Sequence, residues 1–192
     1  LDVMHIMKNV CESLLGTLIN MPERTKDGTK ARNDLIELNI KHELHGGRPQ
    51  NDQDQEEMEG HKEKKVKRND YYCPPSCFTR SKNEIDQFYK CLLGVKVSSG
   101  YSGKIRRYLD EAKQKFSGMK SHNCHVLMMQ ILPVAIRGIM DGHVRETLFG
   151  LCNFFNVISQ KSVGVRQLKR LQEEIVVILC ELEMYFLPAF FD

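Results

Sequence analysis

The sequence predicts a mainly α protein with a helical amino-terminal part, a flexible spacer and a carboxyl-terminal helical bundle. In several segments, apolar residues recur every three or four positions, which is the pattern of an amphipathic helix. Alternating apolar and polar residues, the pattern of a half-buried strand, are scarce, and the best candidate spans only residues 95–97. We therefore expect three parts, at residues 1–45, 46–72 and 73–192.

Residues 1–45 are predicted to form two helices. The first ends at Pro22, because proline lacks the amide hydrogen that a helix interior needs. Its apolar stripe consists of Met7, Val10, Leu14, Leu15, Leu18 and Met21. A second, shorter helix is expected over residues 30–40, with Thr29 as its N-cap.

Residues 46–72 are predicted to be a disordered charged linker. The sequence Gly-Gly-Arg-Pro at residues 46–49 breaks regular structure, and Gln, Asn, Asp and Glu dominate the positions that follow. Too few apolar residues are present to offset the entropy that ordering this segment would cost. The basic run at residues 62–68 fits a nuclear-localisation or phosphate-contacting patch, or else a solvated part of the linker.

The third part, residues 73–192, is predicted to open with a capped helix. Ser81 and Glu84 fit a capping box, in which the serine side chain caps the helix and the glutamate reaches back to it. The apolar face that follows consists of Ile85, Phe88, Tyr89, Leu92 and Leu93. A short further helix is expected around residues 105–109.

The densest apolar region lies at residues 121–192. Residues 126–139 are nearly all apolar and contain Pro133, which predicts either one kinked helix or two shorter ones. Residues 144–158 and 165–186 each predict a further helix. The second has the clearest stripe in the chain: Val165, Leu168, Leu171, Ile175, Ile178, Leu179 and Leu182. Such a helix suits one wall of a bundle, or a seam between two copies.

Composition excludes or disfavours several classes of protein. A net charge of +3 does not by itself indicate a nucleic-acid-binding domain. No apolar run approaches the roughly 20 residues that cross a bilayer, and no secretory signal opens the chain. Seven scattered cysteines favour reduced thiols in an intracellular compartment. A Gly-rich phosphate loop and the Gly-x-Ser-x-Gly elbow are both missing from the sequence.

Two places have residue types that bind metals. Asp2 and His5 could serve a divalent cation, with the carboxylate as ligand, although an acid and a histidine three residues apart also occur by chance. Zinc accepts the side-chain types, thiolate and imidazole, found at Cys77, His122, Cys124 and His125. Cys73 lies four residues before Cys77. The rival interpretation of residues 121–125 is the start of a helix, with Ser121 as its cap and His125 packed.

Several strings of this sequence resemble one plant family. Residues 1–11 (Leu-Asp-Val-Met-His-Ile-Met-Lys-Asn-Val-Cys) and 14–18 (Leu-Leu-Gly-Thr-Leu) resemble the carboxyl-terminal end of the transposase core in plant CACTA-type (En/Spm-like) elements. Residues 26–27, 31–35 and 43–45 fit the same core. The uncharacterised domain that follows that core is similar to residues 74–78, 81–82, 95–96, 100–102, 120–126, 132–138, 171–172 and 188–192.

The resemblance implies a fold and a chemistry for the whole transposase. Such enzymes are expected to have an RNase H-like core in which three acidic residues bind two Mg²⁺ or Mn²⁺ ions for DNA strand transfer. Asp2 would be the second acid, with His5 beside it, and the first acid would lie upstream. Residues 1–45 would then be a remnant of that core. The implied partners are transposon DNA and other transposase chains in the nucleus, with neither a membrane nor a small-molecule substrate.

We therefore expect a transposase fragment without catalytic activity of its own, because one acid cannot hold two metals. The chain opens on Leu1, which suggests a longer reading frame. It departs from the family at Met7, where Glu is usual, and at Cys73, where an apolar residue is usual. These departures suggest a degenerate or domesticated copy, or an imprecise gene model. The alternative function is a helical protein-interaction module retained by a host. We expect the fragment to bind no cofactor by itself, and zinc is the only other metal that the residues suggest.

Overall fold

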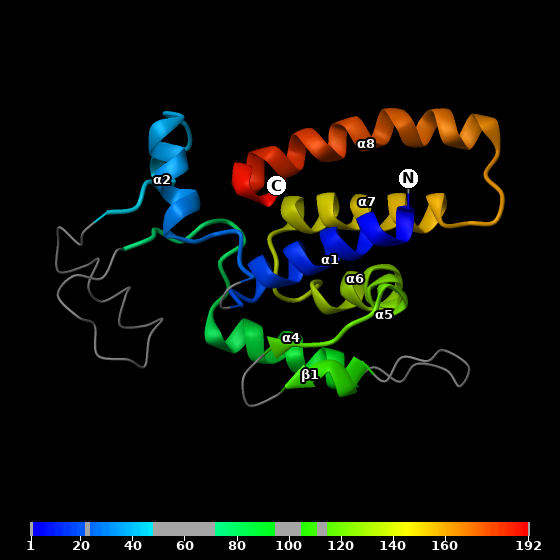
Figure 1. The fold of residues 1–192 in the computed structure, drawn as a ribbon, viewed down its shortest axis with the longest axis horizontal. Coiled ribbons are helices and arrows are strands. Elements are labelled where there is room, and N and C mark those ends of the chain that lie inside the picture. Colours follow the sequence, from blue (N-terminus) through cyan, green and yellow to red (C-terminus); the bar gives the residue numbers. More distant parts are fainter. Residues whose placement is uncertain (1, 22–23, 48–71, 95–104, 111–114, 192) are drawn as a thin grey trace.

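The computed structural model describes residues 2–21, 24–47, 72–94, 105–110 and 115–191, and in these ranges the chain is mainly helical, as predicted (Figure 1). Its longer helices are α1 (Val3–Leu18), α2 (Thr29–Glu37), α4 (Lys82–Gly94), α7 (Gly142–Ile158) and α8 (Val165–Tyr185). The shorter helical elements are η1 (His42–Leu44), η2 (Ile105–Tyr108), α5 (Ser121–Val126), η3 (Leu127–Ile131), α6 (Leu132–Ala135) and η4 (Pro188–Phe190). Strands β1 (Leu109–Asp110) and β2 (Lys115–Phe116) pair antiparallel. The candidate strand at residues 95–97 lies outside the described residues.

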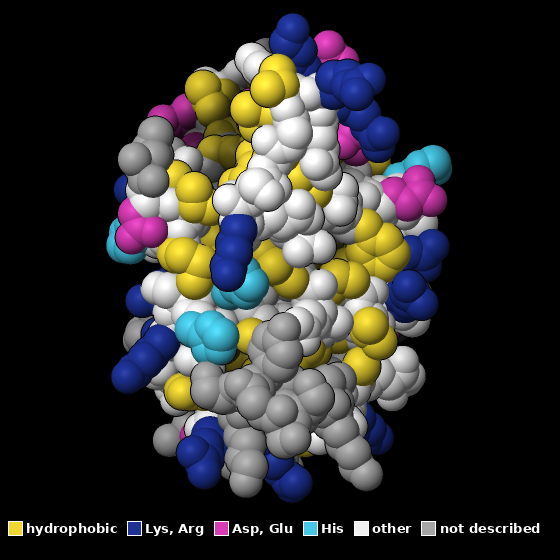
Figure 2. All heavy atoms as spheres, turned by 90° about the vertical axis from the view of Figure 1, so that its right-hand side faces the viewer, with side chains coloured by type: hydrophobic (Ala, Val, Ile, Leu, Met, Phe, Trp, Pro, Cys, Tyr) yellow, Lys and Arg dark blue, Asp and Glu magenta, His cyan; other side chains and the backbone are white. Residues whose placement is uncertain are grey.

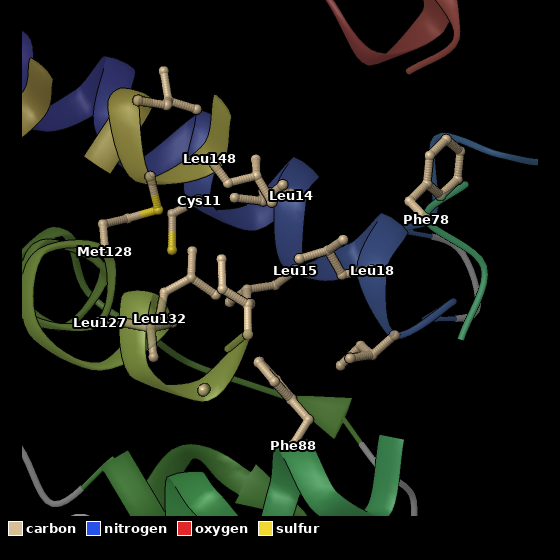
Figure 3. Packing of buried hydrophobic residues seen from close by; sticks show 14 of the residues in the cluster. Cys11, Leu14, Leu15, Leu18, Phe78, Phe88, Leu127, Met128, Leu132 and Leu148 are labelled. Carbon is tan, nitrogen blue, oxygen red and sulfur yellow. The ribbon is translucent and has the colours of Figure 1, made fainter. Parts of the chain in front are cut away.

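Helix α1 lies within the core of the molecule, where it packs on α5 (Figure 1). Its buried side chains Cys11, Leu14 and Leu15 point toward Met128 and Leu148 from later elements (Figure 3). Burial of the predicted stripe of α1 thus requires residues from the carboxyl-terminal part of the chain. Among the described residues, no separate hydrophobic core marks off residues 1–45, and the expected division at residue 45 is not a division between two cores.

The predicted linker lies mostly outside the described residues, which stop at Gly47 and resume at Tyr72. These two residues form an isolated antiparallel bridge, with N···O distances of 2.9 and 2.7 Å. The chain therefore leaves the described part of the structure and re-enters it at the same place.

Gly16 and Thr17, near the end of α1, position the segment that follows the helix. A Cβ atom on Gly16 would lie 2.4 Å from the carbonyl oxygen of Arg24, so only glycine allows this close approach. The hydroxyl of Thr17 donates to the carbonyl of Ser13 (2.8 Å) and accepts from the amide of Lys26 (3.2 Å). Together these contacts fold residues 24–26 back against the helix.

The capping box predicted for α4 is present. The amide of Ser81 donates to Oε2 of Glu84 (2.8 Å), and the amide of Glu84 donates to Oγ of Ser81 (3.3 Å). Two otherwise unpaired amides at the start of α4 are thereby satisfied.

The apolar run around Pro133 forms two short helices joined by a π-helical turn. Of the two predicted arrangements, this is the one with two shorter helices. Helix α5 ends at Val126, the π turn η3 spans Leu127–Ile131, and α6 begins at Leu132. Pro133 lies in the first turn of α6, where its missing amide hydrogen costs nothing. A continuous α-helix would need that amide as a donor, and the wider turn avoids the need.

Helix α8 packs on α7, and its predicted apolar stripe is only partly correct. Leu171 and Leu182 are buried, and Ile175 and Ile178 pack against the core. The approach is close, because a Cβ on Gly150 of α7 would lie 2.9 Å from Cδ1 of Ile178. The other stripe members are exposed: Val165 at 72%, Leu168 at 53% and Leu179 at 44%. These residues lie on the side of α8 that faces away from α7, because α7 covers only one side of the helix.

In the part of the chain that the structure describes, no helix is long and apolar enough to cross a membrane.

Candidate functional site

Asp2 serves as the N-cap of α1. Its Oδ1 atom accepts hydrogen bonds from the amides of Met4 (3.0 Å) and His5 (3.2 Å). A carboxylate at this position satisfies amides that the helix leaves unpaired and complements the positive end of the helix dipole. The predicted pair is therefore linked through the backbone of His5, and both residues are exposed at the start of the helix.

The histidines of α5 lie together, but Cys124 points elsewhere. The rings of His122 and His125 stack with centroids 6.5 Å apart, since residues three apart share one face of a helix. Partial burial, followed by the neighbouring His122, lowers the pKa of His125. Cys124, by contrast, is fully buried. The expected cap at Ser121 is wrong, because the helix begins after Lys120, whose amide donates to Oδ1 of Asn123 (3.0 Å).

Cys124 pairs with Cys11 from α1 inside the core. The hydrogen bond to Cys124 and then burial raise the pKa of the Cys11 thiol well above its usual range. Burial also raises the pKa of Cys152 to about 12. Metal binding and nucleophilic attack need the thiolate, so the raised pKa values of Cys11 and Cys152 favour a role as small buried apolar groups.

The predicted zinc ligands do not come together. Cys77 lies at the end of α8, where its thiol contacts the carbonyl oxygen of Tyr185 at 3.7 Å, whereas Cys124 lies in the core against Cys11. Within the described residues, no group of three or more His, Cys, Asp or Glu side chains is arranged to hold a metal ion. The helical spacing of α5 already directs Cys124 away from both histidines, whereas the separation of Cys77 from Cys124 depends on the tertiary fold.

The carboxyl end of α8 carries a contact that the sequence analysis missed. The Nζ atom of Lys41 donates to the carbonyl oxygens of Glu183 (2.8 Å), Met184 (2.8 Å) and Phe186 (2.7 Å). A cation at a helix carboxyl terminus satisfies unpaired carbonyls and complements the dipole. Desolvation lowers the pKa of Lys41. No sequence signal links residues so far apart.

A cavity of about 310 Å³ lies beside this contact. It is lined by Ile40, Lys41, Glu183, Phe186, Pro188 and Phe191. The ammonium of Lys41 is already bound to three carbonyls, so the cavity presents mainly apolar surface and one carboxylate.

The outer side of α8 is the most apolar exposed surface on a described helix. Its exposed apolar residues are Val165, Leu168, Val176, Val177, Leu179, Cys180 and Met184. Basic residues of the same helix, Arg166, Lys169 and Arg170, are also exposed. Figure 2 shows Lys and Arg side chains gathered at the top of the molecule, where α8 begins. This surface, which we call the outer face of α8, combines exposed apolar area with positive charge.

Compared with family models, curated proteins and solved structures, the chain gives no match.

Proposed function

We propose that the chain is a piece of a plant CACTA-type transposase whose helical body contacts DNA or other transposase chains and cleaves no DNA on its own. The observation that supports this most is the packing of α1 on α5. These helices contain two of the strings that resemble the family, residues 1–18 and 120–126, which lie on opposite sides of the spacer. Strings that belong to one ancestral protein are expected to share one core.

Three more of the resembling pieces meet at Arg32. This fully buried guanidinium pairs with Asp27 through two contacts, Nε to Oδ1 at 2.5 Å and Nη2 to Oδ2 at 2.8 Å. Its Nη1 atom donates to the carbonyl oxygen of Leu44 (2.8 Å). Removing either charged side chain breaks this ion pair, so the pieces that contain Asp27 and Arg32 depend on each other, and the backbone carbonyl of Leu44 brings the third piece to the same contact. This dependence supports a common origin for the resembling strings.

The position of Met7, where the chain departs from the family pattern, is also consistent with a chain that has no cleavage activity of its own. Met7 stands where the family usually has Glu, and it is fully buried in the core. An ionised carboxylate there would need a buried partner. The described residues by themselves do not fit a two-metal centre, since Asp2 is the capping residue of α1 and no cluster of ligands surrounds it. We therefore assign no step of metal-dependent chemistry to them.

In the full transposase, the first of the acids that hold Mg²⁺ or Mn²⁺ would come from residues upstream of Asp2, and we assign no residue to the third. Transposition acts on chromosomal DNA, so the proposal includes a nuclear protein. The basic run at residues 62–68, which would fit a nuclear-localisation signal or a phosphate contact, lies outside the described residues.

The genomic surroundings test this proposal. We expect an in-frame coding segment upstream that supplies the first acid, and terminal inverted repeats that flank the locus. A promoter and a start codon close to Leu1, without such repeats, would instead point to a host gene.

The second candidate is a helical protein-interaction module retained by a host, and the outer face of α8 favours it. Apolar side chains at this density on an exposed helix are typical of a protein-binding surface. Expression separates the candidates: a host module is transcribed from its own promoter in ordinary tissue, whereas a transposon piece depends on the activity of the element.

A further inference from the structure

The middle of α8, residues 175–180, is apolar on every side, yet it is covered on one side only. Residues 175–180 read Ile-Val-Val-Ile-Leu-Cys, and a helix of 3.6 residues per turn distributes six consecutive residues around its whole circumference. A helix that is apolar all round is normally buried all round. Here Ile175 and Ile178 pack toward α7, whereas Val176 and Val177 are 58% and 57% exposed.

The charges of α8 are divided along its length. Arg166, Lys169 and Arg170 lie within its first six residues, and no Lys or Arg follows Arg170 in the helix. Its acidic residues, Glu173, Glu174, Glu181 and Glu183, all follow Arg170. This order opposes the helix dipole, which favours acids at the amino end and bases at the carboxyl end. Within one copy, the arrangement therefore costs helix stability.

Contacts within the chain account for part of this division. Arg170 pairs with Glu174 along the helix at 2.6 Å, and Glu181 accepts a hydrogen bond from Thr147 of α7 at 2.6 Å. The ammonium of Lys41 lies near Glu183, while Arg166 and Lys169 have no ion pair with a described residue in this structure. Helix α7 itself has one Arg and one Glu, Arg145 and Glu146, which are adjacent and balance each other. A neighbour that complements α8 along its length must be acidic where α8 is basic, and basic where α8 is acidic.

We propose that the outer face of α8 binds the same face of a second copy, with the two helices antiparallel and crossing at Val176. An antiparallel copy of α8 has the required order of charges, because its acidic carboxyl-terminal turns lie beside the basic amino-terminal turns of the first helix. Lys169 and Glu183 each lie seven residues from Val176 on the same face. Lys169 of each copy is then opposite Glu183 of the other, while Val176 meets its own counterpart at the two-fold axis. The interface serves a transposase piece and a host module equally, so the inference depends on neither origin.

Oligomeric state is the first test, measured by sedimentation velocity over a range of concentrations. We expect a reversible dimer, and Val176→Glu is expected to raise its dissociation constant about tenfold or more, since the charge would be buried at the axis. Val134→Glu is the matched control, because Val134 is a 50% exposed valine on α6 and away from α8. A chain that stays monomeric at all concentrations overturns the proposal, as does a dimer that Val176→Glu leaves intact.

Charge exchange tests the direction of the helices. Lys169→Glu is expected to weaken the dimer by placing two acids opposite each other, and Lys169→Glu with Glu183→Lys is expected to restore it. Circular dichroism checks that each variant is folded, and both positions are exposed, so the core is not disturbed. A double variant as weak as the single one rejects the antiparallel arrangement.

Disulfide trapping tests the same arrangement independently, in a chain with Cys77→Ser and Cys180→Ser. Val176→Cys is expected to cross-link with itself, whereas Lys169→Cys is expected to cross-link only with a Glu183→Cys chain. In an antiparallel pair the two copies of residue 169 are about 21 Å apart along the axis, at 1.5 Å per residue. Self-cross-linking at residue 169 would show a parallel pair and overturn the proposal.

Discussion

The ammonium group of Lys41 lies 2.7 Å from the carbonyl oxygen of Phe186, a residue 145 positions further along the chain. With its bonds to Glu183 and Met184, this contact ties the segment between α2 and η1 to the carboxyl end of α8. Lys41 has a left-handed backbone (φ 48°), a conformation that costs free energy for any residue other than glycine. The contact offsets that cost and joins the segment after α2 to the carboxyl end of α8.

Removal of the Lys41 ammonium is expected to destabilise the fold. Lys41→Met keeps most of the aliphatic length but leaves three carbonyls without their donor, so the free energy of unfolding should fall by roughly 1–3 kcal/mol. Urea denaturation measures this loss. Lys90→Met, at an exposed position of α4, is the control and should change stability little. Equal stability of the two variants would mean that the Lys41 contact contributes nothing.

Two substitutions separate the capping role of Asp2 from a metal-binding role. Asp2→Ala should lower the free energy of unfolding by about 0.5–2 kcal/mol, whereas Asp2→Asn should lose little, because asparagine also caps helices. If Asp2 is a metal ligand in the full transposase, Asp2→Asn should abolish DNA cleavage there and leave stability unchanged. Full stability of Asp2→Ala would contradict the cap.

The capping box of α4 makes a pH-dependent contribution to stability. The backbone amide of Ser81, followed by its hydroxyl, lowers the pKa of Glu84 below its usual 4.5. The folded state therefore binds the proton less readily than the unfolded state. The added stability is complete above pH 4.5 and is lost as the pH falls through the lower pKa of the folded state.

Glu84→Ala should lower the free energy of unfolding at pH 7 by up to about 1 kcal/mol, since the group is largely exposed. The difference from the parent chain should shrink in acid. Glu84→Gln is the control: it can still accept the hydrogen bond but has no proton to gain, so its own contribution should not change with pH. If the stability difference between Glu84→Ala and the parent chain stays the same below the folded-state pKa of Glu84, the capping box does not depend on an ionised Glu84.

Neighbouring leucines of α8 are expected to differ sharply in their contribution to stability. Leu171 is 4% exposed and Leu168 is 53% exposed, although both belong to the same sequence stripe. Leu171→Ala should cost roughly 2–5 kcal/mol, and Leu171→Asp more, because an unpaired charge would enter the core. Leu168→Ala should cost less than about 0.5 kcal/mol when measured at protein concentrations that exclude dimers. Similar costs at both positions would contradict the one-sided packing of α8 on α7.

The longer helices and one of their caps could be predicted, because both depend on residues that are close together in the sequence. Spacings of three and four residues depend on the geometry of a single helix, so the stripes of α1, α4, α7 and α8 are visible in the sequence. The box at Ser81 and Glu84 spans one helical turn and is equally local. Asp2 shows the limit of this approach, since an acid ahead of an apolar run is also a helix-capping signal, and the sequence analysis interpreted it as a metal ligand.

By itself, the sequence determined which of the longer segments are helical and that a regular helix cannot run unperturbed through Pro133, because these depend on bonds between residues close in the chain. Tertiary structure alone decided which side of each stripe is buried. Leu171 and Leu168 are both apolar, and only the position of α7 covers one and leaves the other exposed. It also decided that α1 shares a core with α5 and that Lys41 binds Phe186, because burial and long-range hydrogen bonds depend on how distant segments meet in space.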